Sequence, residues 1–121
     1  SLILEPMIDI DIEINTNEIT LDFIHELWLL EPYGRDNHKP VFALRGVRVI
    51  DYRLVGNPAI HLKMTISSGD KSISGIAFGY GESANFNNNK LYDLAVTLEL
   101  NEWNNRKNVE FRLIDIKEHH D

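Results

Sequence analysis

The sequence predicts a mainly β fold, a five-stranded barrel of the OB type preceded by a β-strand and a short amphipathic helix. Five runs with strand-like alternation follow one another over residues 41–116, and a longer break separates the third run from the fourth. The chain has 121 residues, 43% of them hydrophobic and 26% charged, which suits one domain with a buried core. An SH3-like barrel or a small sandwich is the alternative architecture.

Two elements are predicted before the barrel. Isoleucines alternate with acidic residues over 7–14, which indicates a half-buried strand with all of its isoleucines inward. A helix is predicted over 20–31, because Thr20 can cap it and apolar residues recur at helical spacing. Pro32 ends this helix, and a loop rich in turn-forming residues follows over 32–40.

The barrel strands are predicted over residues 41–54, 59–67, 72–79, 91–100 and 108–116. In the second of these, Ile60 and every second residue after it are expected inward, with the polar residues between them outward. Gly46 predicts a bulge or bend in the first strand. A polar loop over 101–107 is expected between the last two strands.

Charge is distributed unevenly along the chain, whose net charge is −7. Residues 1–34 contain eight acidic residues and no Lys or Arg, whereas residues 35–121 contain all 12 Lys and Arg against 11 acidic residues. We therefore divide the chain into an acidic N-terminal arm, 1–34, that packs on or links to the barrel, and an OB-fold domain, 35–121. A balanced barrel can gather positive charge on one face, which permits a nucleic-acid ligand.

Composition also restricts the location and chemistry of the chain. It has no cysteine, so disulfides and thiolate metal sites are excluded. No stretch approaches the roughly 18 apolar residues of a membrane span, and the N-terminus does not resemble a signal peptide. We therefore expect a cytoplasmic protein without membrane contact. The chain does not begin with Met, which is consistent with a piece of a longer protein.

Candidate nucleic-acid contacts gather where OB barrels bind, along the second and third strands and at two loops. Trp103 offers an aromatic face for stacking a base, although a hydrophobic plug over the barrel end explains it equally well. Phe78 is interpreted as a core residue more readily than as a ligand contact. Cationic or polar contacts to phosphates are expected from Arg106, Lys107, Lys63, His61, Arg45 and Arg48, for each of which an ordinary exposed position is the alternative.

No constellation predicts a catalytic or metal-binding site. Asp9, Asp11 and Glu13 are spread along one strand face at about 7 Å intervals, which favours a solvated face. His119 and His120 lie near the chain end, where a frayed tail is expected. No catalytic and no metal residue is therefore predicted, and a free-standing enzyme is the least favoured class.

Several segments together resemble the RecJ family of single-strand-specific DNA exonucleases. The stretch LEPYGRDNHKPVF at 30–42 resembles a family motif of Leu-Glu-Pro-aromatic-Gly, then Gly-Asn-Pro, then Pro-Val-Phe. It departs from that motif at Asp36, where a Gly is usual, and at His38, where a Pro is usual. The resemblance continues through ALRGVRV at 43–49, HLK at 61–63, IAFG at 76–79, LELNEWN at 98–104 and LIDI at 113–116.

This resemblance implies the OB domain that follows the catalytic DHH and DHHA1 domains of such an exonuclease, without those domains. It implies that the domain guides single-stranded DNA to a core that degrades DNA from the 5′ end, with Mn²⁺ or Mg²⁺ held by residues upstream of this chain. The implied processes are DNA repair and recombination. The implied partners are single-stranded DNA, the catalytic domains of the same parent chain, and single-strand-binding or repair proteins. The alternative function is a structural or protein-docking module that braces the exonuclease core or binds a partner protein.

Overall fold

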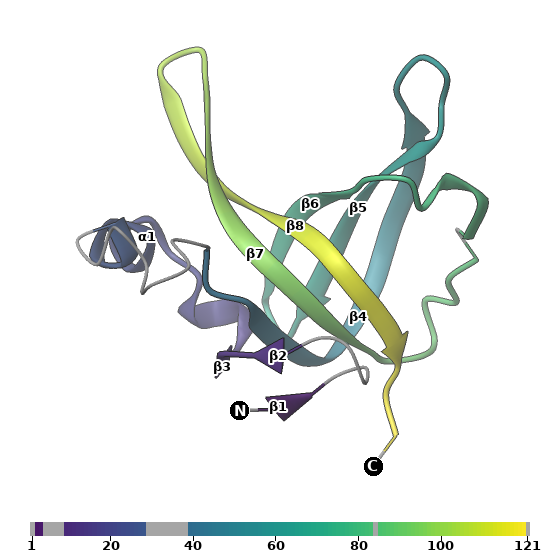
Figure 1. Ribbon diagram of the computed structural model, residues 1–121, viewed down its shortest axis with the longest axis horizontal. Coiled ribbons are helices and arrows are strands. Elements are labelled where there is room, and N and C mark those ends of the chain that lie inside the picture. The colour runs from purple at the N-terminus through teal and green to yellow at the C-terminus, as the bar shows by residue number, and fades with distance from the viewer. Residues whose placement is uncertain (1, 4–8, 29–38, 84, 121) are drawn as a thin grey trace.

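Five strands form the barrel, in the chain order β4 Phe42–Val55, β5 His61–Ser68, β6 Lys71–Ala77, β7 Tyr92–Trp103 and β8 Arg106–Glu118 (Figure 1). The computed structural model describes residues 2–3, 9–28, 39–83 and 85–120, without the side chains at positions 2, 3, 9, 27, 28, 83 and 103. β4 pairs antiparallel with both β5 and β7, and β6 closes the barrel by a parallel pairing with β8. This topology confirms the predicted OB-type barrel.

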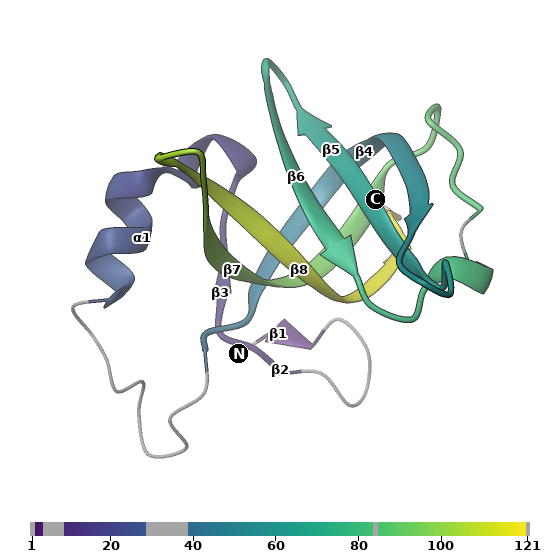
Figure 2. The same ribbon diagram turned by 90° about the horizontal axis from the view of Figure 1, so that it is seen from above.

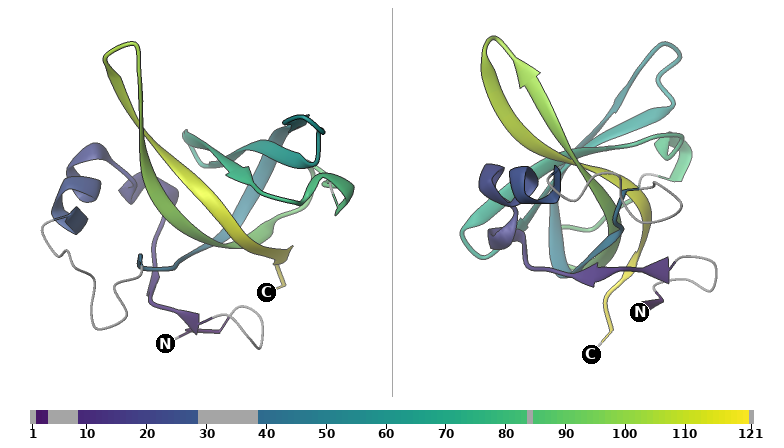
Figure 3. Two further views of the ribbon diagram at one scale, coloured as in Figure 1. Left: turned by 45° about the horizontal axis from the view of Figure 1, so that its top comes forward. Right: turned by 60° about the vertical axis from the view of Figure 1, so that its left-hand side comes forward.

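The parallel seam between β6 and β8 is short. It consists of the pairs Gly75↔Phe111 and Ile76↔Arg112. A Cβ atom at position 75 would collide with the backbone and ring of Phe111, so only glycine permits this close approach. Before Gly75 the two strands are not paired, and the β7–β8 hairpin projects beyond the barrel (Figures 1 and 3).

The β7–β8 hairpin is longer than predicted. Its strands run to Trp103 and start again at Arg106, so the expected loop over 101–107 is reduced to a two-residue turn. Asn104 and Asn105 have φ values of 51° and 62°. Asparagine tolerates this left-handed region, and two such residues in succession are typical of a type I′ turn, whose twist matches that of the flanking strands.

The first strand of the arm is interrupted where one continuous strand was predicted. β2 Asp9–Ile10 pairs with β1 Leu2–Ile3, whereas β3 Ile12–Glu13 pairs parallel with the start of β4. The chain changes partner at Asp11, whose carboxylate accepts a hydrogen bond of 2.8 Å from the Val41 N–H. The expectation that all isoleucines point inward is therefore wrong for Ile12, which is 44% exposed.

A helix follows the arm's strands, as predicted. A short 3₁₀ helix, η1 Thr16–Glu18, leads into α1 Leu21–Trp28, and the Thr20 hydroxyl caps α1 by accepting the Phe23 N–H at 3.1 Å. α1 contacts β7 and β8 beside the hairpin (Figure 2). The predicted end of the helix at 31 and residues 32–38 of the predicted loop over 32–40 lie outside the described residues. No helix in the described part of the chain has the length and apolarity needed to cross a membrane.

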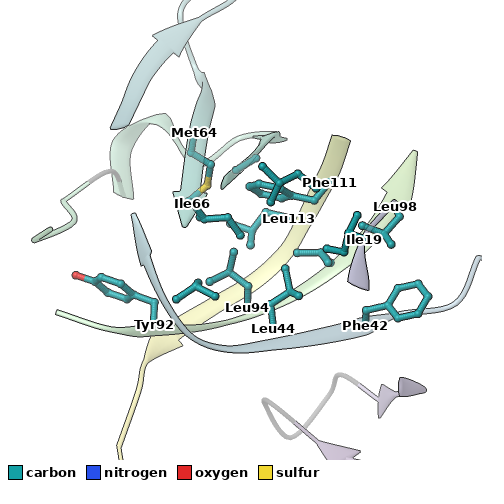
Figure 4. Close-up of a cluster of buried hydrophobic side chains, with 14 of the residues drawn as sticks. Ile19, Phe42, Leu44, Met64, Ile66, Tyr92, Leu94, Leu98, Phe111 and Leu113 are labelled. Atoms are coloured by element: carbon teal, nitrogen blue, oxygen red, sulfur yellow. The ribbon is translucent and has the colours of Figure 1, made fainter. Parts of the chain in front are cut away.

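The arm contributes directly to the barrel core. Ile19 and Ile24 are 3% and 1% exposed and pack in the core formed by the five strands. Figure 4 shows Ile19 in this cluster with Phe42, Leu98 and Phe111. Burying an isoleucine side chain stabilises a fold by about 1.5–3 kcal/mol. The described part of the arm thus belongs to the packed core of the barrel. It also places residues beside the candidate site described below.

Candidate nucleic-acid interface

The outer face of β5 is polar, as its alternation predicts. His61, Lys63, Thr65 and Ser67 are half-buried on this face, whereas the residues between them are buried in the core. Ile60, expected inward, precedes β5 and is 46% exposed. The strands that bind ligands in OB folds therefore present hydrogen-bonding and cationic groups to solvent.

A row of cations crosses this face. The strand registers pair Arg53 with Lys63, Lys63 with Ile76, and Ile76 with Arg112, so the four residues lie side by side on β4, β5, β6 and β8. Among the described residues, none of the three cations has a carboxylate within 4.0 Å. Sequence reasoning identified Lys63 but missed Arg53 and Arg112, because only the barrel closure brings β8 beside β6.

An aromatic side chain lies beside this row. Phe78, just after β6, is 47% exposed, so its interpretation as a core residue is wrong. The Arg112 guanidinium carbon is 4.7 Å from the centroid of the Phe78 ring, and the ring of His61 is 5.1 Å away in an edge-on arrangement. The His61 Nδ1 accepts the Gly79 N–H at 2.9 Å, which fixes the imidazole against the loop. An exposed ring with cations around it can stack a base and bind the adjoining phosphate.

Two of the predicted phosphate contacts lie elsewhere. Arg45 precedes Arg53 by eight residues, roughly 25 Å of extended strand. Its guanidinium pairs with Glu13 at 3.0 Å and with Asp93 at 3.5 Å. Arg48 is exposed and donates a hydrogen bond of 3.2 Å to the carbonyl of Asn88. Neither side chain joins the row across β5.

The remaining predicted contacts lie at the hairpin. Trp103 pairs with Arg106 through the backbone at the turn, but its side chain is outside the described part, so plug and stacking platform both stay predictions. Arg106 and Lys107 are exposed. Lys107 also lines a groove of about 650 Å³ between the start of α1 and the diverging strands β6 and β8. Lys63 lines the same groove, which therefore joins the hairpin to the outer face of β5.

A buried carboxylate, that of Asp93, accepts several bonds near the start of β7, at the end of the barrel opposite the hairpin turn. Asp93 is 2% exposed and accepts the N–H of Gly46 at 2.9 Å, where a register shift marks the predicted bulge. Its other partners are Arg45 and the Nδ1 of His119, the latter at 2.7 Å. The backbone N–H of His119 also donates to the Leu91 carbonyl, so the expectation of a frayed tail is wrong at this position.

Nothing in this arrangement of described residues fits a divalent cation of the kind that the family resemblance implies. Within the described ranges, no three His, Cys, Asp or Glu side chains come together as ligands. The described residues offer cations, amides and an aromatic ring instead. Groups of this kind can bind an anionic chain.

Comparison with known proteins identifies relatives of this chain. Residues 10–115 match the family described as the RecJ OB domain. The single-stranded-DNA-specific exonuclease RecJ of Bacillus subtilis (strain 168) is 28% identical over 111 residues, which are 91% of this chain and 14% of that protein.

Solved structures agree with this match. The crystal structure of RecJ in complex with Mn²⁺ from Thermus thermophilus has a TM-score of 0.62 and 26% identity over 82% of this chain and 14% of that chain. Its counterpart with Mg²⁺ has the same TM-score and 24% identity over 82% of this chain and 15% of that chain. The chain thus spans only about a seventh of the length of these relatives. Because the family match covers most of the barrel and most of the described arm, the chain belongs to the RecJ OB domain family.

Proposed function

We propose that this domain binds single-stranded DNA through the outer face of β5, β6 and β8, as the OB domain of a RecJ-like exonuclease. The observation that carries this proposal is the row of Arg53, Lys63 and Arg112 beside the exposed ring of Phe78, with no carboxylate paired to the cations among the described residues. The relative from B. subtilis is a single-stranded-DNA-specific exonuclease, which supports the choice of ligand.

The chemistry of this face favours a single strand over a duplex. A single strand exposes its bases, and stacking one of them on an aromatic side chain contributes about 1–3 kcal/mol. Each phosphate contact on a single strand changes the slope of log K against log salt concentration by about −0.7. Three or four contacts on a domain of net charge −7 therefore give modest, salt-sensitive affinity.

The role in the whole protein follows from this proposed binding of single-stranded DNA. The domain guides the strand to a catalytic core elsewhere in the parent chain, which degrades DNA from its 5′ end with Mn²⁺ or Mg²⁺ during repair and recombination in the cytoplasm. The domain itself supplies binding and no chemistry. The acidic arm, 1–34, braces the barrel, 35–121, through the burial of Ile19 and Ile24.

Fluorescence anisotropy with labelled single-stranded and duplex oligonucleotides, at low and moderate salt, tests this proposal. We expect Lys63→Ala and Phe78→Ala each to weaken single-strand binding by about tenfold. Lys90→Ala is the matched control, because Lys90 carries the same charge but is paired with Glu118 at 3.4 Å. Trp103→Ala and Arg106→Ala report on the hairpin tip.

Equal binding of duplex and single strand would contradict the proposal, as would equal losses in the Lys63 and Lys90 variants. Absence of binding even at low salt would overturn it and favour the protein-docking module.

A further inference from the structure

We infer that the groove between α1 and the β6–β8 seam holds one nucleotide of the bound strand and favours bases with an exocyclic amino group. This inference rests on the proposed function, because the groove continues the outer face of β5 through the shared side chain of Lys63. Its volume of about 650 Å³ lies within the range of roughly 300–1,000 Å³ that is usual for small-ligand sites.

The groove exists because of the seam and the arm. β6 and β8 pair only at Gly75 and Ile76 of β6, so their earlier residues diverge and leave a gap. The arm closes that gap from one side, where the buried Ile19 enters the core and its carbonyl accepts a hydrogen bond of 3.0 Å from the Lys71 ammonium group. That single bond fixes the Lys71 side chain and leaves two of its three N–H donors for a ligand.

The described lysines and carboxylates that line the groove form no ion pairs with each other. Lys63, Lys71 and Lys107 line it together with the carboxylates of Asp22 and Glu110, all of them described residues. Within this described set, no ion pair within 4.0 Å joins any of the lysines to either carboxylate. A ligand that carries both an anion and hydrogen-bond donors satisfies both sets of groups. A nucleotide has this chemistry, since its phosphate suits the ammonium groups and a base amino group suits the carboxylates.

The carboxylates make the groove selective. An ionised carboxylate only accepts hydrogen bonds, so it pairs with the N4 amino group of cytosine and is repelled by the O4 acceptor that thymine presents at the same position. One such contact is sufficient for about a tenfold difference in affinity. Glu110, which is half-buried on β8, should contribute more of this preference than the exposed Asp22.

The test compares labelled (dC) and (dT) oligonucleotides of about 12 residues, a length within the usual site size of an OB fold. We expect the unaltered chain to bind (dC) about tenfold more tightly than (dT). Glu110→Gln should bring the two affinities within about twofold of each other, because the amide also offers donors to O4. Glu99→Gln is the control, since Glu99 faces Glu110 across the hairpin but is paired with Lys39 at 3.1 Å.

The outcomes separate this inference from the proposed function. Equal affinities for (dC) and (dT) in the unaltered chain would overturn the inference, and so would a preference that survives in both Glu110→Gln and Asp22→Asn. In either case, single-strand binding that is lost in Lys63→Ala would leave the proposed function in place. Failure of both oligonucleotides to bind would instead overturn the proposed function itself.

Discussion

Cations at the two ends of β4 are held in different ways. Near its start, Arg45 lies between Glu13 and the buried Asp93. Near its end, Arg53 lies beside Lys63 on the outer face, where neither has a carboxylate within 4.0 Å among the described residues. A paired cation has its charge satisfied inside the fold and therefore stabilises it, whereas an unpaired cation keeps its charge for a ligand. Arginine thus pairs with carboxylates near the start of β4 and is left available for a ligand near its end.

The largest effect on stability should come from Asp93, the buried carboxylate that pairs with Arg45 near the start of β4. Asp93→Ala leaves the Gly46 N–H, His119 and Arg45 without their shared acceptor. Breaking a buried charged cluster costs about 3–5 kcal/mol. We therefore expect the free energy of unfolding to fall by about 3 kcal/mol in urea titrations. A change of less than about 1 kcal/mol in the free energy of unfolding of Asp93→Ala would contradict the view that the cluster near the start of β4 stabilises the fold.

On the proposed DNA-binding face, Arg112→Ala should lower affinity and leave stability nearly unchanged. It removes a cation and its contact with the Phe78 ring, which lies 4.7 Å away. We expect the single-strand Kd to rise about tenfold, while the free energy of unfolding changes by no more than about 0.5 kcal/mol. Paired anisotropy and urea measurements on one preparation check both halves. A large loss of stability with unchanged affinity would show that Arg112 stabilises the fold and does not contact DNA.

Arg45→Ala sharpens the same comparison, because Arg45 was a sequence-predicted phosphate contact. Its side chain is 34% exposed and bound to two carboxylates. We expect a loss of about 1 kcal/mol in unfolding free energy and an unchanged salt slope for DNA binding. A slope that became less negative by about 0.7 would instead restore Arg45 as a phosphate contact.

The smallest effect should follow from Glu13→Gln, which removes the exposed half of this network. The Glu13 side chain is 48% exposed, and exposed ion pairs contribute about 0–1 kcal/mol. Thermal unfolding should therefore shift by only a few degrees, and less at high salt. A shift as large as that of Asp93→Ala would mean that the arm depends on this pair more than on the burial of Ile19 and Ile24.

Much of the barrel could be predicted from alternation, because β5 and much of the other strands bury every second residue and the period of two is local. The hairpin turn was missed in extent, although two successive asparagines are a signal for a type I′ turn. The break at Asp11 could not be predicted, because it reflects a change of strand partner. Parallel pairing of β3 with β4 depends on contacts thirty residues apart, which no local pattern encodes.

The candidate site was harder to predict than the fold. Lys63 could be placed because outward positions on one strand follow from alternation. Arg112 lies 49 positions later and reaches Phe78 only after the barrel closes. Likewise, nothing local indicated that Arg45 of β4 and His119, after β8, would both contact Asp93 of β7. Sequence patterns indicate which side chains face solvent, and the closure decides which of them meet.

The network around Asp93 has a consequence for modular construction. Through Arg45 it holds Glu13 of β3, and through His119 it holds the segment just after β8, at the same point. A domain whose entry and exit lie together can be placed within a longer polypeptide as a side lobe, without lengthening the path between the segments on either side. The turn of the β7–β8 hairpin lies at the other end of these strands, so it can be exchanged while this attachment point stays the same.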